Sequence, residues 1–152
     1  MESVELLLGL AENDLVLALL LFAGTTALVA CCVPGAIVGM SVSAASLLGN
    51  WLAVPVVSTG ALAGSLILFL TIRHADAGRA RRRLGSKLQT IEKRFVKHGA
   101  WYIVGLRLLG APHFLVTAAS ALLPLRASTF ATATVAGLLP AIATAAAAGA
   151  AL

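Results

Sequence analysis

One permanently charged side chain lies inside a long apolar stretch of this sequence. Arg107 is the only charged residue between Lys97 and Arg126, and it stands in GLRLLGAP, residues 105–112. A charge at bilayer depth costs roughly 2.5–3.5 kcal/mol on insertion scales. A guanidinium is planar and binds phosphate through two parallel hydrogen bonds. We therefore expect Arg107 to have a partner, and phosphate is a partner that its chemistry fits.

Two other roles for Arg107 stay open from the sequence alone. Its long side chain could reach back to the headgroup region. It could also donate to backbone carbonyls that a break near Gly110 and Pro112 leaves without partners. His113 follows Pro112 and carries an imidazole whose charge changes near neutral pH, although a single histidine is more often a structural hydrogen-bonding group.

The composition indicates the class of protein that positions these residues. Hydrophobic residues make up 60% of the 152 residues and charged residues only 11%, whereas a soluble domain carries about 25% charged residues. So few charges cannot cover a soluble surface, and we expect an integral membrane protein. No carboxylate lies in an apolar segment, and no hydrolase or metalloprotease motif occurs. We expect no enzyme, no catalytic residue, no metal and no cofactor.

Long apolar blocks divide the chain. An acidic segment, residues 1–14, precedes a single membrane domain, residues 15–152, and no cleaved signal peptide is evident. We expect an all-α fold with about three transmembrane helices, at Leu15–Cys32, Leu52–Ile72 and Thr129–Leu152.

Two further apolar segments are short or broken. Ala36–Leu48 is bounded by the turn signals Pro34 and Gly35 and by Gly49, and its 13 residues reach about 20 Å, short of a hydrocarbon core of roughly 30 Å. We expect a re-entrant segment there, with a short tilted span as the alternative. The block 100–123 contains Arg107 and a proline, and it is either re-entrant too or a kinked full span.

The basic residues are concentrated in one segment, Arg73–His98, which holds nine of the eleven Lys and Arg residues. Apolar residues recur there at spacings of four, three and four, which is typical of an amphipathic helix at a membrane surface. By the positive-inside rule this segment is cytoplasmic. We expect it to bind anionic lipid headgroups rather than nucleic acid, through the cluster Arg79, Arg81, Arg82 and Arg83.

The two short segments give the chain two units of the same plan. Each unit has a short or broken segment and then a full span: 34–48 with 52–72, and 100–123 with 129–152. With the basic segment in the cytoplasm, the two units have opposite orientations. This inverted repeat is the plan of many secondary transporters.

Four segments follow one another in a characteristic order: VPGAIVGMSVSAASLLG, GALAGSLILFLTIRHADAGRARRRLG, RLLGAPHFLVTAASALLPLRASTF and AGLLP. Together they resemble the DedA / SNARE-associated Golgi protein family, also called VTT-domain proteins, over about residues 33–152. The resemblance implies a membrane protein with two facing re-entrant hairpins. It also implies lipid movement across the bilayer: phospholipid scrambling in eukaryotic relatives, and recycling of polyprenyl-phosphate carrier lipid in bacterial ones.

The resemblance also implies a substrate site. It puts the family's membrane arginine on Arg107, its later proline on Pro112 and the polar position after it on Thr117. With His113 these residues form the expected substrate site, and Pro34, Gly35 and Gly49 are expected to form the first hairpin.

One departure from the family concerns acidic residues. Ala36 stands where many bacterial members carry an acid, and no acid occurs between Asp14 and Asp76. Proton coupling through a membrane carboxylate is therefore in doubt for this chain.

The sequence thus predicts a lipid transporter or scramblase in a bacterial cytoplasmic membrane. Its partners would be membrane lipids, above all anionic headgroups at the cytoplasmic face, and a homo-oligomer stays open. The small-residue faces of its spans suit close packing between helices. The alternative is a structural or adaptor membrane protein of the envelope, which would need neither an embedded charge nor broken helices.

Overall fold

The structure, a computed structural model, describes residues 14–151, and for residues 76–97 it describes the backbone alone. The elements in this part of the chain are all helices, as the sequence predicts. They are α2 (Asp14–Ala30), α3 (Ala36–Leu48), α4 (Asn50–Leu108), α5 (His113–Leu122) and α6 (Ala127–Gly149).

Two helical stretches of the described chain are long and apolar enough to cross a membrane. They are Asn50–Ala75, the first part of α4, with 26 residues, and α6 with 23 residues, and they correspond to two of the three expected spans. The third expected span, Leu15–Cys32, is shorter than predicted. Helix α2 has 17 residues and reaches about 25 Å, because an α-helix rises only 1.5 Å per residue.

Helices α2 and α3 form a helical hairpin. The amide of Val33 donates to Leu28 O (3.0 Å), the amide of Cys32 donates to Val29 O (3.1 Å), and Cys32 has a positive φ of 60°. This pair of bonds around a left-handed residue is the Schellman motif, which ends α2. Pro34 and the left-handed Gly35 follow, and α3 then packs back against α2.

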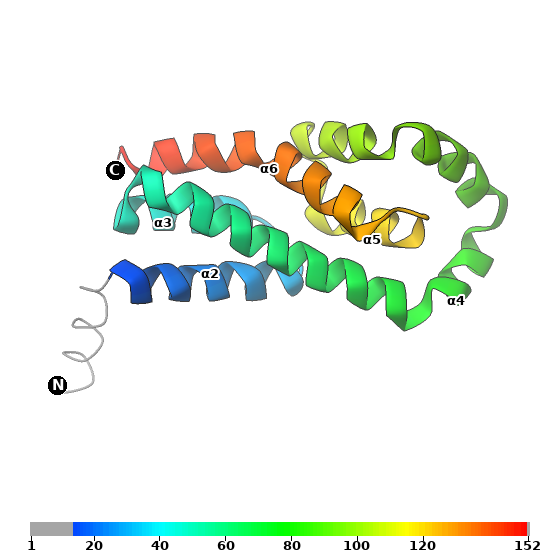
Figure 1. Ribbon diagram of the computed structural model, residues 1–152, viewed down its shortest axis with the longest axis horizontal. Helices are drawn as coiled ribbons and strands as arrows, with labels where there is room; N and C mark the ends of the chain where they lie inside the picture. The colour runs from blue at the N-terminus through cyan, green and yellow to red at the C-terminus, as the bar shows by residue number, and fades with distance from the viewer. Residues whose placement is uncertain (1–13, 152) are drawn as a thin grey trace.

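A second hairpin has a turn of the same construction. The amide of Ala111 donates to Leu106 O (2.9 Å), the amide of Gly110 donates to Arg107 O (3.2 Å), and Gly110 has a φ of 75°. This Schellman motif ends α4, a proline again follows, and α5 runs back alongside the end of α4 (Figure 1). The stretch 100–123 is therefore a hairpin of two helices and not one kinked helix.

Helix α4 has 59 residues and turns back on itself (Figure 1). Phe69 and Ile103 belong to the same buried cluster, whereas a straight helix would separate them by about 50 Å. The basic segment lies where α4 turns back. The predicted headgroup cluster lies outside the described side chains: Arg79, Arg81, Arg82 and Arg83.

The two hairpins occupy opposite ends of the molecule (Figure 1). The first part of α4 and helix α6 run antiparallel along its length and pack against each other. One buried cluster joins α2 and α3 to the start of α4 and the end of α6. A second joins the turned-back end of α4 and α5 to the start of α6.

Glycines on α4 let α2 approach closely. A Cβ on Gly60 would lie 3.0 Å from Phe22 O, and a Cβ on Gly64 would lie 2.6 Å from Thr26 O. Thr26 Oγ1 also donates to Gly60 O (3.2 Å). The small-residue face that the sequence indicates on this span is therefore a contact between helices.

We predict that Gly64→Ala destabilises the fold by about 1–3 kcal/mol, because the new methyl group would overlap backbone of α2. Gly39→Ala is the matched control, since a Cβ at Gly39 in α3 meets nothing within 4 Å. Reversible unfolding in mixed detergent micelles measures both. Equal stability of the two variants would contradict the close contact between α2 and α4.

Candidate functional site

Arg107 is buried near the end of α4, with 6% of its surface exposed. Its Nη1 lies 2.7 Å from His113 Nδ1. Its Nη2 donates to Thr117 Oγ1 (3.4 Å) and to Thr134 Oγ1 (3.2 Å). Three of the four residues that the sequence assigns to the substrate site, Arg107, His113 and Thr117, therefore contact one another.

One face of α6 receives the Arg107 side chain. Phe130, Thr134 and Gly137 follow at helical spacings of four and three. The Arg107 Cζ lies 5.8 Å from the centre of the Phe130 ring, in the range of a cation–π contact. A Cβ on Gly137 would lie 2.9 Å from Arg107 Cβ, so only glycine leaves room for the arginine stem there.

His113 begins α5 and connects Arg107 to the first part of α4. Its Nε2 lies 3.1 Å from Ser65 Oγ, and Ser65 Oγ donates to Ala61 O (2.5 Å). Pro112, at the N-cap of α5, has a φ of −53° and no amide donor, which suits the start of a helix. The reversal at Pro112 thus brings His113 onto both Arg107 and Ser65.

A cavity of about 430 Å³ lies between the turns of the two hairpins. Its lining includes Pro34 and Gly35 from the first turn, and Arg107, Pro112 and His113 from the second hairpin. Thr117 and Gly49 do not line the cavity. Thr117 contacts Arg107 from α5. Gly49 lies at the far end of α3, where it has a φ of 76° and separates α3 from α4.

Arg107 has no carboxylate partner among the described side chains, of which only the exposed Asp14 is acidic. The acceptors around Arg107 are neutral, and its buried Nε has no hydrogen-bond partner in the described part of the chain. Arg107 therefore retains both a net charge and a free donor.

The two other roles considered for Arg107 do not fit this geometry. The guanidinium bonds to side chains, so it is not the donor for backbone carbonyls near Gly110 and Pro112. The side chain is buried and its guanidinium bonds to side chains of α5 and α6, so it does not extend to the surface of the protein.

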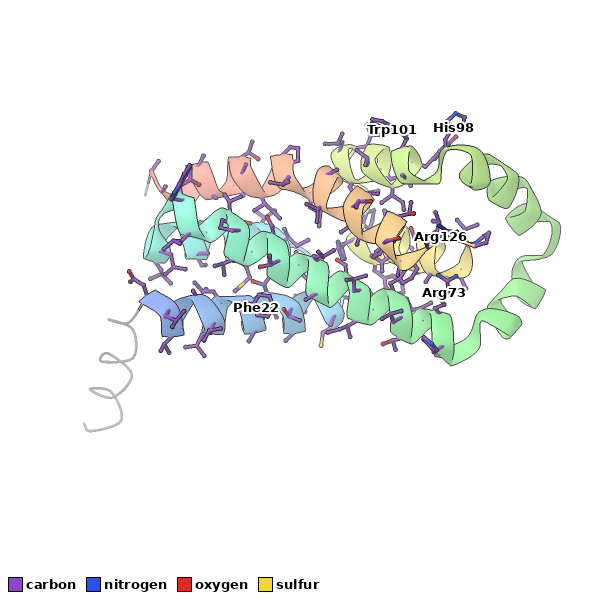
Figure 2. The ribbon with its side chains drawn as sticks, in the orientation of Figure 1. Phe22, Arg73, His98, Trp101 and Arg126 are labelled. Carbon is purple, nitrogen blue, oxygen red and sulfur yellow. The ribbon has the colours of Figure 1, made fainter. Side chains whose placement is uncertain are left out.

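A stack of buried aromatic rings separates Arg107 from the end of the molecule where α6 begins. Phe69 and Phe130 stack with ring centres 4.5 Å apart, and both are fully buried. Arg73 lies over the other side, 5.4 Å from the centre of the Phe69 ring, and donates to Leu125 O (2.5 Å). Figure 2 shows Arg73 and Arg126 at this same end.

Sequence reasoning missed four residues that contact Arg107 or its partner: Ser65, Phe130, Thr134 and Gly137. Small residues at helical spacing were the only signal for this face of α6, and they indicated packing between helices rather than a contact with Arg107. Nothing local in the sequence connects Ser65 with His113, which lies 48 positions later.

Comparison with known families decides the relationship that the segments above indicate. The VTT domain family matches residues 15–151. The chain belongs to the VTT domain family. This is the domain of the DedA / SNARE-associated Golgi proteins. Together with the two apolar helices that are long enough to cross a membrane, the match indicates a membrane protein of that family. Neither curated proteins nor solved structures gave a match to this VTT-domain protein.

We predict that Thr134→Val destabilises this VTT-domain protein by about 1–3 kcal/mol, because it removes an acceptor from a buried guanidinium without changing the shape of the side chain. Thr132→Val on the same helix should be nearly neutral, since the exposed Thr132 hydroxyl bonds only to its own helix. Unfolding in detergent micelles compares the two. If the Thr134 variant is as stable as the Thr132 variant, the bond from Arg107 is not formed in solution.

Proposed function

We propose that this protein transports phosphate-bearing lipids across a bilayer, as a transporter or scramblase of the DedA type. The observation that carries the proposal is Arg107, a buried cation that has no carboxylate partner among the described side chains and that lines a cavity between two hairpin turns. The lipids in question are phospholipids or a polyprenyl-phosphate carrier, and the membrane is a bacterial cytoplasmic membrane.

The charge of Arg107 supports an anionic ligand. A buried cation without a counter-ion is costly, and the described side chains give Arg107 only neutral acceptors. A phosphate group in the cavity would supply the missing charge. The headgroup is what bars a lipid from crossing the hydrocarbon core, so a guanidinium part-way across would lower that barrier while the acyl tails stay in lipid.

Two helix N-termini at the cavity support the same ligand. Helices α3 and α5 begin at Ala36 and His113, and both residues line the cavity. The first amides of a helix have no partner within the helix, and the helix dipole places partial positive charge there. Helix N-termini are therefore common binding positions for phosphate. The turn of the first hairpin, which has no charged side chain, would contribute through its backbone.

The matching turns support an inverted repeat of two re-entrant hairpins. Each turn has a Schellman motif followed by a proline, and each hairpin precedes a full-length helix. Helices α3 and α5, with 13 and 10 residues, reach about 20 and 15 Å, too short for a core of roughly 30 Å. The hairpins would enter from opposite faces, with the basic segment in the cytoplasm.

Arg107→Ala should abolish most lipid transfer in reconstituted liposomes. A charge-assisted hydrogen bond contributes about 1.5–3 kcal/mol, so the transfer rate should fall by about 10–100-fold. Arg107→Lys keeps the charge but loses the planar group that forms two parallel hydrogen bonds, and it should give an intermediate rate. The measurement is transbilayer movement of labelled lipids with several headgroups.

Arg126→Ala is the matched control, because Arg126 is an exposed arginine at the N-cap of α6. It should transfer lipid at the wild-type rate, and gel filtration and unfolding should confirm that all variants fold. A wild-type rate for Arg107→Ala would refute this role for the arginine. A wild-type protein that moves no lipid at all would instead be the structural or adaptor protein.

Cysteine labelling tests the orientation of the hairpins, in a background without Cys31 and Cys32. Helices α2 and α4 begin at the same end of the molecule (Figure 1). We therefore predict that Asp14→Cys and Asn50→Cys react from the external side, and His98→Cys from the cytoplasm. Reaction of Asp14→Cys from the cytoplasm would show that α2 spans the bilayer.

A further inference from the structure

The hydrogen bond between Arg107 and His113 fixes the proton positions of the imidazole. A guanidinium carries only donors, so His113 Nδ1 must accept from Arg107 Nη1 (2.7 Å). In a neutral imidazole the proton is then on Nε2, which donates to Ser65 Oγ (3.1 Å), and Ser65 donates to Ala61 O. Each of these three hydrogen bonds then has one donor and one acceptor when His113 is neutral.

An anion that takes over Arg107 Nη1 would change this arrangement. His113 Nδ1 would lose its donor and would present a bare lone pair to the anion, which is repulsive. A proton on Nδ1 would turn that repulsion into a second charge-assisted hydrogen bond. The bond from Nε2 to Ser65 would stay in place, because Nε2 carries a proton in both charge states of the ring.

Charge balance gives a reason to bind that proton. A phosphate monoester carries a charge of about −1.5 to −2 at pH 7, since its second pKa is about 6. Arg107 supplies one positive charge, which balances a phosphodiester but leaves a dianionic monoester with one uncompensated charge. Uncompensated charge inside an apolar protein or bilayer is costly.

His113 is the group around the cavity that can supply the second positive charge. The titratable side chains of the lining are Arg107, His113 and Cys32, which comes from the α2–α3 turn. A thiol can only lose a proton and become negative. The polar partners that α4, α5 and α6 present to the pair are the hydroxyls of Ser65, Thr117 and Thr134, and none of them titrates near neutral pH.

We infer that the cavity binds a phosphate monoester lipid together with one proton, which His113 Nδ1 takes from solvent. The bond from Arg107 Nη1 to Nδ1 breaks, and both groups then donate to the phosphate oxygens. No other bond forms or breaks. A phosphodiester lipid, whose one charge Arg107 balances, would bind without the proton and without breaking the bond from Arg107 Nη1 to Nδ1. This inference rests on the proposed function and assigns the proton to a histidine rather than a carboxylate.

Calorimetry with two matched probes tests the inference. The probes are dodecyl phosphate and its methyl ester, which differ only in one ionisable oxygen, and the full-length protein is in detergent micelles. Titrations in buffers of different ionisation enthalpy, at a pH well above the monoester's second pKa of about 6, count the protons taken up. We expect close to one proton per monoester and none per diester.

His113→Asn should abolish the proton uptake and weaken monoester binding by about tenfold or more, because one charge-assisted bond is lost. Unfolding of this variant in detergent micelles, compared with that of the wild type, checks that the site still folds. His98→Asn is the matched control, since His98 is exposed and lies on the outer side of α4 (Figure 2). It should behave as the wild type does.

A second measurement does not depend on the folding of the His113 variant. His113 becomes the only histidine when His74 and His98 are replaced by Asn. The ¹⁵N NMR signal of its Nδ1 should change from that of an unprotonated to that of a protonated nitrogen when dodecyl phosphate binds.

The outcomes separate this inference from the proposed function. If the wild type binds neither probe, both proposals are wrong. If both probes bind but His113→Asn still takes up a proton with the monoester, the phosphate itself carries the proton and only the inference fails. Equal proton uptake with the two probes, or an unchanged Nδ1 signal, also overturns the inference alone.

Discussion

The burial of one guanidinium among neutral groups is the constraint on which the arrangement around the cavity depends. Arg107 donates to neutral acceptors on α5 and α6 and lies over an aromatic ring of α6. Its stem packs against α6 at a glycine, where a larger residue would overlap it. Each of these contacts requires another part of the fold. Helix α5 must reverse at Pro112, and α6 must run past the end of α4 with Gly137 at the crossing.

The two hairpins solve a problem of backbone chemistry. Backbone groups freed at a helix end are costly in an apolar medium, and both turns satisfy them by the same pair of bonds around a left-handed residue. Glycine takes that conformation in the second turn and Cys32 in the first. A left-handed cysteine is unfavourable, so the shared geometry is kept in spite of the residue.

The sequence predicted those parts of the fold that local chemistry determines. Helix α3 has the bounds expected from Pro34 and Gly35 before it and Gly49 after it, because proline and glycine act on their own backbone. Helix α2 ends at Ala30, two residues before the predicted end at Cys32, since nothing before Cys31 marks the end of an apolar helix. Ser65 and Thr134 could not be predicted as site residues, because their contacts depend on how α4 and α6 pack. Arg107 could be predicted because a charge in an apolar block is visible without any structure.

The stacked rings of Phe69 and Phe130 bear on the permeability of the membrane. They lie fully buried between Arg107 and Arg73, so the line that joins the two cations is dry. A hydrated ion that followed this line would have to separate α4 from α6 and lose its hydration water between two aromatic rings. The loss of hydration has a high free-energy cost. Along this line the two rings therefore form an apolar barrier to ions.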